Sequence, residues 1–312
     1  MHLKLLLAPA LFSLMISSAS SADEAAPAAI LADLLARKQA ILASAGPTAP
    51  AQTLFLAFWD FDGTILKGDC SEGLMDGDKP VYPGLAERLI ESGHSRIYPP
   101  GTGVQAFWSD YRHMEETIGP WLAYPYIPQM LRGANAEAVA TLSREHFEAV
   151  LRRYYFAGSI ELLNSLERNG VENHVISASA DLFVDAAAPT LGLPPDRLNG
   201  ITLRIRDGVL TEELVYPVTL AEGKTARLLE IVAKTRLRHP GAPIVVLAGF
   251  GNSYRTDGPF LKHIATQSLS SASPVSVMIN GGDEPAAYQG LFKRITLTET
   301  LSSSARPAPP AK

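Results

Sequence analysis

The sequence predicts an α/β protein with a parallel β-sheet between two layers of helices. Short apolar runs end abruptly in small or polar residues, and segments with helical spacing alternate with them. This alternation is typical of parallel sheets that are covered by helices on both faces. With 312 residues, of which 46% are hydrophobic, the chain has enough apolar material for a large core and one or two domains.

The first predicted strand carries the most informative residues of the chain. The apolar run 54–59 ends in Asp60-Phe61-Asp62, and Gly63 then allows the positive φ of a tight turn. Both carboxylates therefore follow the carboxyl end of a buried strand, which is where open α/β sheets bind ligands. Because two acids at this spacing repel each other, we expect a cation beside them.

We expect three further strands and one hairpin. The strands are predicted at 173–176, 243–248 and 274–280, each followed by a polar residue or glycine. In the hairpin, alternating residues from Ile201 onward lead to Asp207-Gly208, a two-residue turn, and a second strand follows to Val215.

The two ends of the chain are predicted to lie outside the core. Residues 1–22 resemble a secretory signal peptide, because a lysine precedes an apolar run that ends in small residues. That run is short for a membrane span, so we favour cleavage over an uncleaved anchor and expect a periplasmic or secreted protein. Residues 23–52 are predicted to form an N-terminal helical extension, and 301–312 a disordered tail.

Composition excludes several classes of function. The net charge is −5 and no basic cluster is present, so binding to nucleic acid is not expected. No segment after the signal peptide is long and apolar enough to span a membrane. Cys70 is the only cysteine, which rules out a disulfide within the chain, and we expect it to be a small packing residue. The sequence does not predict the oligomeric state.

Three other segments place reactive residues near predicted strand or helix ends. Ser177 follows the second strand and can donate to an anion, although a serine there is often only a helix cap. Lys224 opens a predicted helix, and Gly223 before it permits close backbone approach. The run from Gly251-Asn252 to Asp257 follows the strand at 243–248.

Taken in order, these four segments resemble the motifs of the haloacid dehalogenase (HAD) superfamily. Asp60-Phe61-Asp62-Gly63-Thr64 matches the first motif, DxDx[TV], and the others match motifs II to IV at plausible strand ends. One residue departs from the pattern, because Asn252 stands where the family usually has a metal-binding aspartate. The small hairpin between motifs II and III is similar to the phosphoserine phosphatase-like branch.

The resemblance implies a three-layer Rossmann-like parallel sheet core with a helical cap inserted between motifs I and II. The core would comprise 53–67 and 158–300, and the cap 68–157, where aromatic residues and Pro-rich joints interrupt the strand–helix rhythm.

The resemblance also implies a Mg²⁺-dependent phosphatase. Asp60 would attack phosphorus to form an aspartyl-phosphate, and Asp62 would act as general acid and then general base. Ser177 and Lys224 would bind the phosphoryl oxygens. The metal would be held by Asp60, Asn252 and Asp257, and by the backbone carbonyl of Asp62.

The expected partner is a small phosphorylated metabolite. Ile65 to Asp69 looks like the corresponding segment of secreted phosphorylcholine phosphatases, and Asp69 or Glu72 could face a cationic leaving group beside the aromatic residues of the cap. Phosphoserine-like and other phosphomonoesters remain open, since those aromatic residues could equally form the core of the cap. A different reading also stays open, in which the protein is a secreted binding protein of this fold, catalytically weakened or inactive.

Overall fold

The computed structural model of the protein describes residues 26–44, 53–267 and 273–304. The expected signal peptide, 1–22, lies outside these residues. Within the described part of the chain, no helix combines the length and the hydrophobicity needed to cross a membrane. Helix α1 (Pro27–Ser44) lies inside the expected N-terminal extension, with Ile30 and Leu34 buried.

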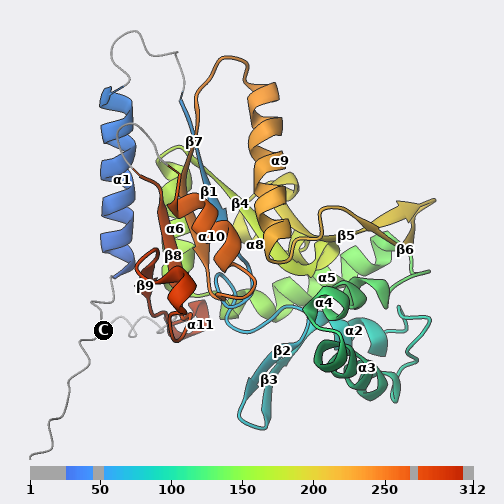
Figure 1. The fold of residues 1–312 in the computed structure, drawn as a ribbon. Coiled ribbons are helices and arrows are strands. Elements are labelled where there is room, and N and C mark those ends of the chain that lie inside the picture. The colour runs from blue at the N-terminus through green and yellow to red at the C-terminus, as the bar shows by residue number, and fades with distance from the viewer. Residues whose placement is uncertain (1–25, 45–52, 268–272, 305–312) are drawn as a thin grey trace, which may run out of the picture.

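A seven-stranded sheet forms the centre of the molecule, in the order β6-β5-β4-β1-β7-β8-β9 (Figure 1). All neighbouring strands are parallel except β5 and β6. The strands are β1 (Leu54–Trp59), β4 (Val171–Ala180), β5 (Leu198–Arg206), β6 (Val209–Val215), β7 (Ile244–Gly251), β8 (Val275–Ile279) and β9 (Lys293–Ile295). The predicted fold class is therefore confirmed.

Strand β1 is buried on both faces, as a central parallel strand must be. Its alternate residues join two different clusters of the core: Phe55, Ala57 and Trp59 join one, and Leu56 and Phe58 join the other. Helices α1 and α6 (Ala157–Arg168) cover the first face. Helices α9 (Glu222–Arg238) and α10 (Gly258–Ala265) cover the second, which gives three layers.

The structure confirms the predicted hairpin of the sheet but not the predicted end of the second strand. The hairpin is confirmed, since Asp207 and Gly208 both have positive φ (50° and 76°), as a two-residue turn between β5 and β6 requires. The predicted end of the second strand is wrong. Strand β4 runs on through Ser177 to Ala180, with an irregular register against β5, so Ser177 lies within the strand and is no helix cap.

Several short elements complete the core. They are α7 (Asp181–Asp185), α8 (Ala188–Leu191), η2 (Pro195–Arg197), η3 (Ala286–Tyr288) and α11 (Leu301–Ser304). The last of these forms helix where the tail, 301–312, was expected to be disordered, because the backbone amide of Leu301 donates to the carbonyl of Tyr155 (3.0 Å). Residues 305–312 lie outside the described part of the chain.

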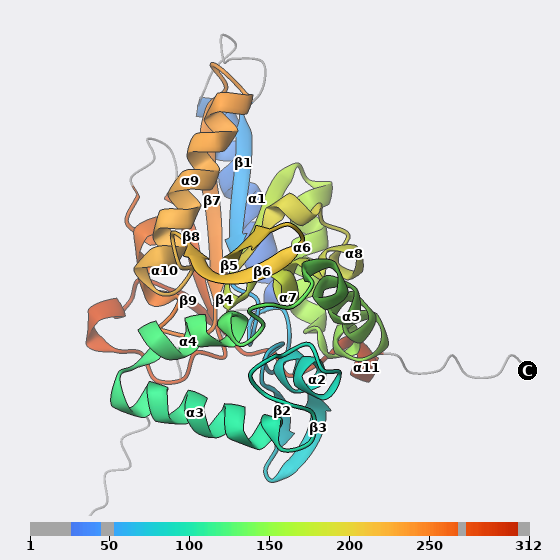
Figure 2. The same ribbon diagram turned by 90° about the vertical axis from the view of Figure 1, so that its right-hand side faces the viewer.

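The segment between β1 and α6 lies beyond the carboxyl ends of the parallel strands (Figures 1 and 2). We call it the cap, as in the predicted range 68–157. It contains β2 (Gly73–Asp76), β3 (Lys79–Pro83), α2 (Leu85–Glu91), α3 (Gly103–Thr117), α4 (Pro120–Gln129), α5 (Ala136–Ala149) and η1 (Leu151–Tyr154).

The cap departs from the prediction at its start, where a β-hairpin precedes the helices. Strands β2 and β3 pair antiparallel, and Gly77 at φ 57° forms the turn between them. The Gly77-Asp78 dipeptide was the sequence signal for this hairpin. Most of the cap's aromatic rings pack on one another: the ring of Phe107 is fully buried against Tyr98, Trp108 and Tyr126.

Candidate active site

Asp60 is held at the end of β1 by one backbone hydrogen bond and two side-chain hydrogen bonds. Its backbone amide donates to the carbonyl of Phe250 on β7 (2.8 Å), which continues the sheet pairing by one residue. The Thr64 hydroxyl donates to carboxylate Oδ2 (2.8 Å), and the Lys224 ammonium donates to Oδ1 (2.6 Å). Asp60 is buried, and each of its carboxylate oxygens accepts one of these two hydrogen bonds.

Lys224 joins Asp60 to Asp257 inside the protein. Its Nζ also lies 2.6 Å from Asp257 Oδ1, and neither of these two side chains is exposed. The other carboxylate oxygen of Asp257 accepts from the backbone amides of Asn252 (2.9 Å) and Ser253 (3.0 Å). One buried ammonium therefore fixes the ends of β1 and β7 relative to each other. We call these three side chains the Lys224 centre.

The start of α9 places Lys224 there. Ala221, just before the helix, adopts φ 49°, and Gly223 lies so close to the chain that a Cβ would be 1.7 Å from the carbonyl oxygen of Val218. No other residue type fits at 223 without moving the backbone. The close approach expected from the sequence is present.

Asp62 lies in a different set of hydrogen bonds. The Ser179 hydroxyl donates to its Oδ2 at 2.6 Å, and the Ser177 hydroxyl lies at 3.4 Å from the same oxygen. The backbone amide of Cys70 donates to Oδ1 (2.6 Å). Sequence reasoning singled out Ser177 and missed Ser179, whose position two residues further along the same strand was the available signal.

Burial raises the pKa values of these acids. Burial and the neighbouring Asp257 raise the pKa of Asp60 to about 6, although Lys224 acts in the opposite direction. Burial, followed by the charge of Asp69, raises the pKa of Asp62 well above its ordinary value. Burial alone would lower the pKa of Lys224, but the carboxylates of Asp257 and Asp60 outweigh it and raise that pKa. The ammonium is thus charged at neutral pH.

Asp69 and Glu72 lie at the border between core and cap. The Asp69 carboxylate accepts from the backbone amides of Ser71 (2.6 Å) and Glu72 (2.9 Å), and burial raises its pKa. Glu72 accepts a weak hydrogen bond from the Tyr111 hydroxyl (3.3 Å). Burial, with Asp69 nearby, raises the pKa of Glu72 to about 7.

A pocket of about 140 Å³ collects most of the predicted site residues. It is lined by Asp60, Asp62, Asp69, Tyr124, Ser177, Ala178, Ser179, Asn252, Ser253 and Thr256. Lys224 and Asp257 lie behind Asp60 and do not line it, and Glu72 does not line it either. The structure therefore brings five predicted residues to one surface and adds Tyr124, one of the aromatic residues noted in the cap sequence.

The chemistry of the lining fits a hard cation. Among the described residues that line the pocket, three are carboxylates and none is basic. The Asn252 side chain packs so closely on the first-motif turn that a Cβ at Gly63 would lie 1.9 Å from its Nδ2. Asp60 and Asn252 line the same pocket and both carry a side-chain oxygen, which is the ligand type that Mg²⁺ prefers.

A second group of possible ligands lies beside the first. One ligand atom each from Asp62, Asp69 and Cys70 lies within 4.8 Å of the others. Cys70 is buried as expected, and burial with the charge of Asp62 raises its pKa well above the ordinary value. A protonated thiol is a poor ligand for a hard cation, so this group fits Mg²⁺ less well.

Comparisons with known proteins agree with this picture. The profile of the haloacid dehalogenase-like hydrolases matches residues 57–262, more than half of the chain. No curated protein shows a significant match.

Among solved structures, a protein of unknown function from Bordetella pertussis Tohama I is similar at 16% identity and TM-score 0.58, over 78% of this chain and 99% of that one. A functionally unknown protein from Anaerococcus prevotii DSM 20548 is similar at 13% identity and TM-score 0.52, over 80% and 86%. These two similarities support the fold alone. A phosphoserine phosphatase structure is similar at 16% identity, over 80% and 96% of the two chains, but its TM-score of 0.46 supports no argument about activity.

Proposed function

The chain belongs to the haloacid dehalogenase-like hydrolases, and from this premise we propose that it hydrolyses phosphate monoesters through an aspartyl-phosphate on Asp60. One observation carries the proposal. The carboxylate of Asp60 lines a small pocket with its position fixed by Lys224 and Thr64, and a second acid, Asp62, lines the same pocket.

In the first step, a carboxylate oxygen of Asp60 attacks phosphorus and the bond from phosphorus to the leaving oxygen breaks. Asp62 gives its proton to that oxygen. The burial that raises the pKa of Asp62 favours the protonated acid that this step requires. Ser177 lines the pocket and can donate its hydroxyl to a phosphoryl oxygen, while Lys224 balances the charge of Asp60 from behind.

In the second step, Asp62 takes a proton from water, and the resulting hydroxide attacks phosphorus. The bond from phosphorus to Asp60 breaks, inorganic phosphate leaves and the Asp60 carboxylate is restored. Ser179 holds the carboxylate of Asp62 through a 2.6 Å hydrogen bond. The same acid therefore stays in reach of the leaving-group oxygen in the first step and of the attacking water in the second.

We assign a Mg²⁺ site to the Asp60 carboxylate, the Asp62 backbone carbonyl and the Asn252 amide oxygen. The bound cation would offset the repulsion between an anionic nucleophile and an anionic phosphate. Asp257 contributes by fixing the backbone at Asn252, since its Oδ1 accepts from Lys224 and its Oδ2 accepts from the backbone amides of 252 and 253. Its predicted role as a direct ligand stays a prediction.

The substrate is proposed to be a small phosphorylated metabolite, with phosphorylcholine and phosphoserine-like compounds as the first candidates. Asp69 and Tyr124 line the pocket, so a carboxylate and an aromatic residue are available to a cationic leaving group. We further propose that the protein is secreted or periplasmic, on the basis of the predicted signal peptide.

The proposal is tested by assaying the purified protein with Mg²⁺ and p-nitrophenyl phosphate. We expect release of phosphate, and loss of at least about a hundredfold in kcat for Asp60→Asn. Asp196→Asn, at an exposed carboxylate, is the matched control and should keep full activity. An inactive native protein that binds phosphate would instead support the alternative, a binding protein weakened by Asn252.

The role of Asp62 predicts a dependence on the leaving group. Asp62→Ala should slow hydrolysis of alkyl phosphates by roughly a hundredfold or more, because an alkoxide leaves poorly without a proton. The same variant should affect p-nitrophenyl phosphate much less in the step that releases nitrophenolate. Single-turnover rates for both substrates measure the difference, and equal losses would contradict the assignment of Asp62 as the acid.

A further inference from the structure

One exposed arginine joins the core to the cap beside the pocket. Arg255 lies in the loop between β7 and α10, and its Nη2 lies 3.0 Å from Glu115 Oε1 on α3. The same nitrogen donates to the Tyr124 hydroxyl on α4 (3.3 Å). Tyr124 lines the pocket, so a core residue is bonded directly to the cap residue that faces the reacting groups.

Hydrogen bonds hold the backbone of the loop that carries Arg255. The backbone amide of Asp257 donates to the carbonyl of Ser253 (2.8 Å), and the amide of Thr256 donates to the hydroxyl of Ser253 (3.2 Å). The Asp257 carboxylate holds the start of the same loop and is itself bonded to Lys224. Arg255 therefore extends from a backbone that is held by hydrogen bonds, and its side chain contacts the cap.

The cap is attached to the core at a second place, the hairpin β5–β6. Backbone hydrogen bonds join Gly133 to Leu210 (2.8 Å), Leu210 to Ala134 (2.9 Å) and Ala136 to Gly208 (2.9 Å). The Gln129 side chain donates to the carbonyl of Glu212 (2.9 Å).

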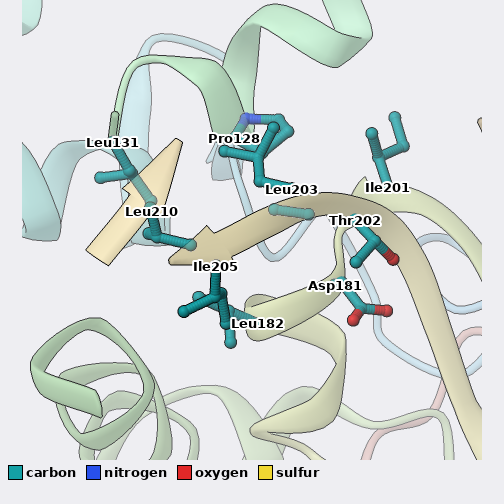
Figure 3. A pocket seen from close by; sticks show the side chains of 10 residues that line it. Pro128, Leu131, Asp181, Leu182, Ile201, Thr202, Leu203, Ile205 and Leu210 are labelled. Atoms are coloured by element: carbon teal, nitrogen blue, oxygen red, sulfur yellow. The ribbon is translucent and has the colours of Figure 1, made fainter. Parts of the chain in front are cut away.

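Apolar side chains reinforce this second attachment. Pro128 and Leu131 of the cap point toward Leu203 and Leu210 of the hairpin (Figure 3). The cavity left between them is only about 40 Å³, so the two surfaces fit closely.

The two attachments differ in strength. Several backbone hydrogen bonds and buried apolar contacts must break together at the hairpin. The side chain of Arg255 is 59% exposed, and an exposed ion pair contributes little because water competes for both partners. Tyr124 also packs on a core cluster of Ala178, Ile201, Val218 and Leu220. The contacts of Arg255 are thus the part of this side of the cap that breaks at low cost.

We propose that Arg255 is a positioning residue, which holds the cap closed over the pocket and places Tyr124 against the substrate. The cap opens by breaking the contacts of Arg255 with Glu115 and Tyr124, and it pivots at the β5–β6 hairpin. The catalytic part of this inference rests on the proposed phosphatase activity, whereas the structural part does not.

A charge-swap series tests the contact through activity. Arg255→Glu and Glu115→Arg should each raise KM for p-nitrophenyl phosphate about three- to fivefold with kcat changed less, because a smaller fraction of the enzyme has the closed cap. The double variant, which restores opposite charges, should recover most of the loss. A purely structural contribution would lower the melting temperature in all three variants and give no recovery of KM.

Hydrogen exchange tests the same contact without activity. In Arg255→Glu, backbone amides of α3 and α4 should exchange faster, while those of α5 and β6 should not change. Arg144→Ala is the matched control, since its ion pair with Glu137 lies within the cap, and it should alter neither KM nor exchange in α3 and α4. Arg255→Gln serves the same comparison if the glutamate variant folds poorly.

The outcomes separate the two proposals. Faster exchange in α3 and α4 in a protein that shows no phosphatase activity would support the cap contact and overturn the proposed function. An active enzyme whose exchange and KM are both unchanged in Arg255→Glu, or whose double variant shows no recovery, would overturn the role of Arg255.

Discussion

The Lys224 centre and the Arg255 contact are both made by one cation with two partners, yet their surroundings differ. Lys224 lies fully buried between Asp60 and Asp257, at 2.6 Å from each. Arg255 is mostly exposed between Glu115 and Tyr124, at 3.0 and 3.3 Å. Each joins segments far apart in the chain, by 164 residues for Lys224–Asp60 and by 140 for Arg255–Glu115.

The difference shows how the same chemistry serves a fixed part and a movable part. A buried charge that loses its partner has no water to replace it, so the Lys224 centre holds the reacting carboxylate in one position. An exposed charge that loses its partner is rehydrated at once, so the Arg255 contact can break at low cost, as the proposed opening of the cap requires. The four predictions below test this contrast, beginning with the largest expected effect.

Removing the buried cation should have the largest effect. Lys224→Met leaves Asp60 and Asp257 buried side by side without a positive charge, and should lower the free energy of unfolding by about 3–5 kcal/mol as well as abolish activity. Urea unfolding at pH 7 measures the loss. Lys234→Met, at an exposed position of the same helix, is the control and should change stability by less than about 0.5 kcal/mol. Similar losses in both variants would contradict a buried ion-pair centre.

A half-buried acid beside another acid gives the next effect. Burial and the nearby Asp181 raise the pKa of Asp185 to about 8, and one of its carboxylate oxygens has no hydrogen-bond partner. Because the folded state binds this proton more tightly than the unfolded state, wild-type stability should fall as pH rises from about 4 to about 8. Asp185→Asn does not titrate, and should be more stable than wild type by ~2 kcal/mol at pH 8.5, a discounted value for a half-buried group.

Thermal unfolding of both proteins from pH 4 to pH 8.5 checks this prediction. The stability difference should shrink as pH is lowered, once the carboxyl is protonated in the folded and the unfolded protein alike. A difference that stays constant with pH would show that packing rather than ionisation distinguishes the two side chains.

A charge added beside the Lys224 centre should have a smaller effect. Asn252→Asp gives Mg²⁺ a charged ligand in place of an amide, and should tighten Mg²⁺ binding by about tenfold. In metal-free protein the new carboxylate lies near Asp60, so stability should fall. Calorimetric Mg²⁺ titration measures the affinity, with Asn135→Asp at the N-cap of α5 as the control. An unchanged titration would remove Asn252 from the metal site.

The smallest effect on stability is expected at the exposed contact. Arg255→Ala should change the free energy of unfolding by no more than about 0.5 kcal/mol, even though its KM rises. Urea unfolding at low and at high salt measures this, and salt should reduce the difference further because exposed charges are screened. A loss as large as that of Lys224→Met would mean that the two centres do not differ as their burial indicates.

Much of the site was predictable because its residues follow one another closely in the chain. Asp60 and Asp62 directly follow the first strand and Asp69 comes soon after them at the start of the cap, and the apolar run before them indicates a buried strand. Gly223 and Gly251-Asn252 were also identifiable, since a glycine beside a reactive residue indicates close backbone approach. These signals are local, and they predicted the structure correctly because the strand and the turn after it depend mainly on neighbouring residues.

The sequence by itself determined the main strands and helices of the core and several of the residues at the carboxyl edge of the sheet, because burial and turn preference act over a few neighbouring residues. Only the tertiary structure decided which of them touch. Ser179 rather than Ser177 lies closest to Asp62, Lys224 lies behind Asp60, and Arg255 reaches Glu115 on the cap. These contacts depend on how strands and helices more than a hundred residues apart pack together, and a local sequence pattern does not predict such packing.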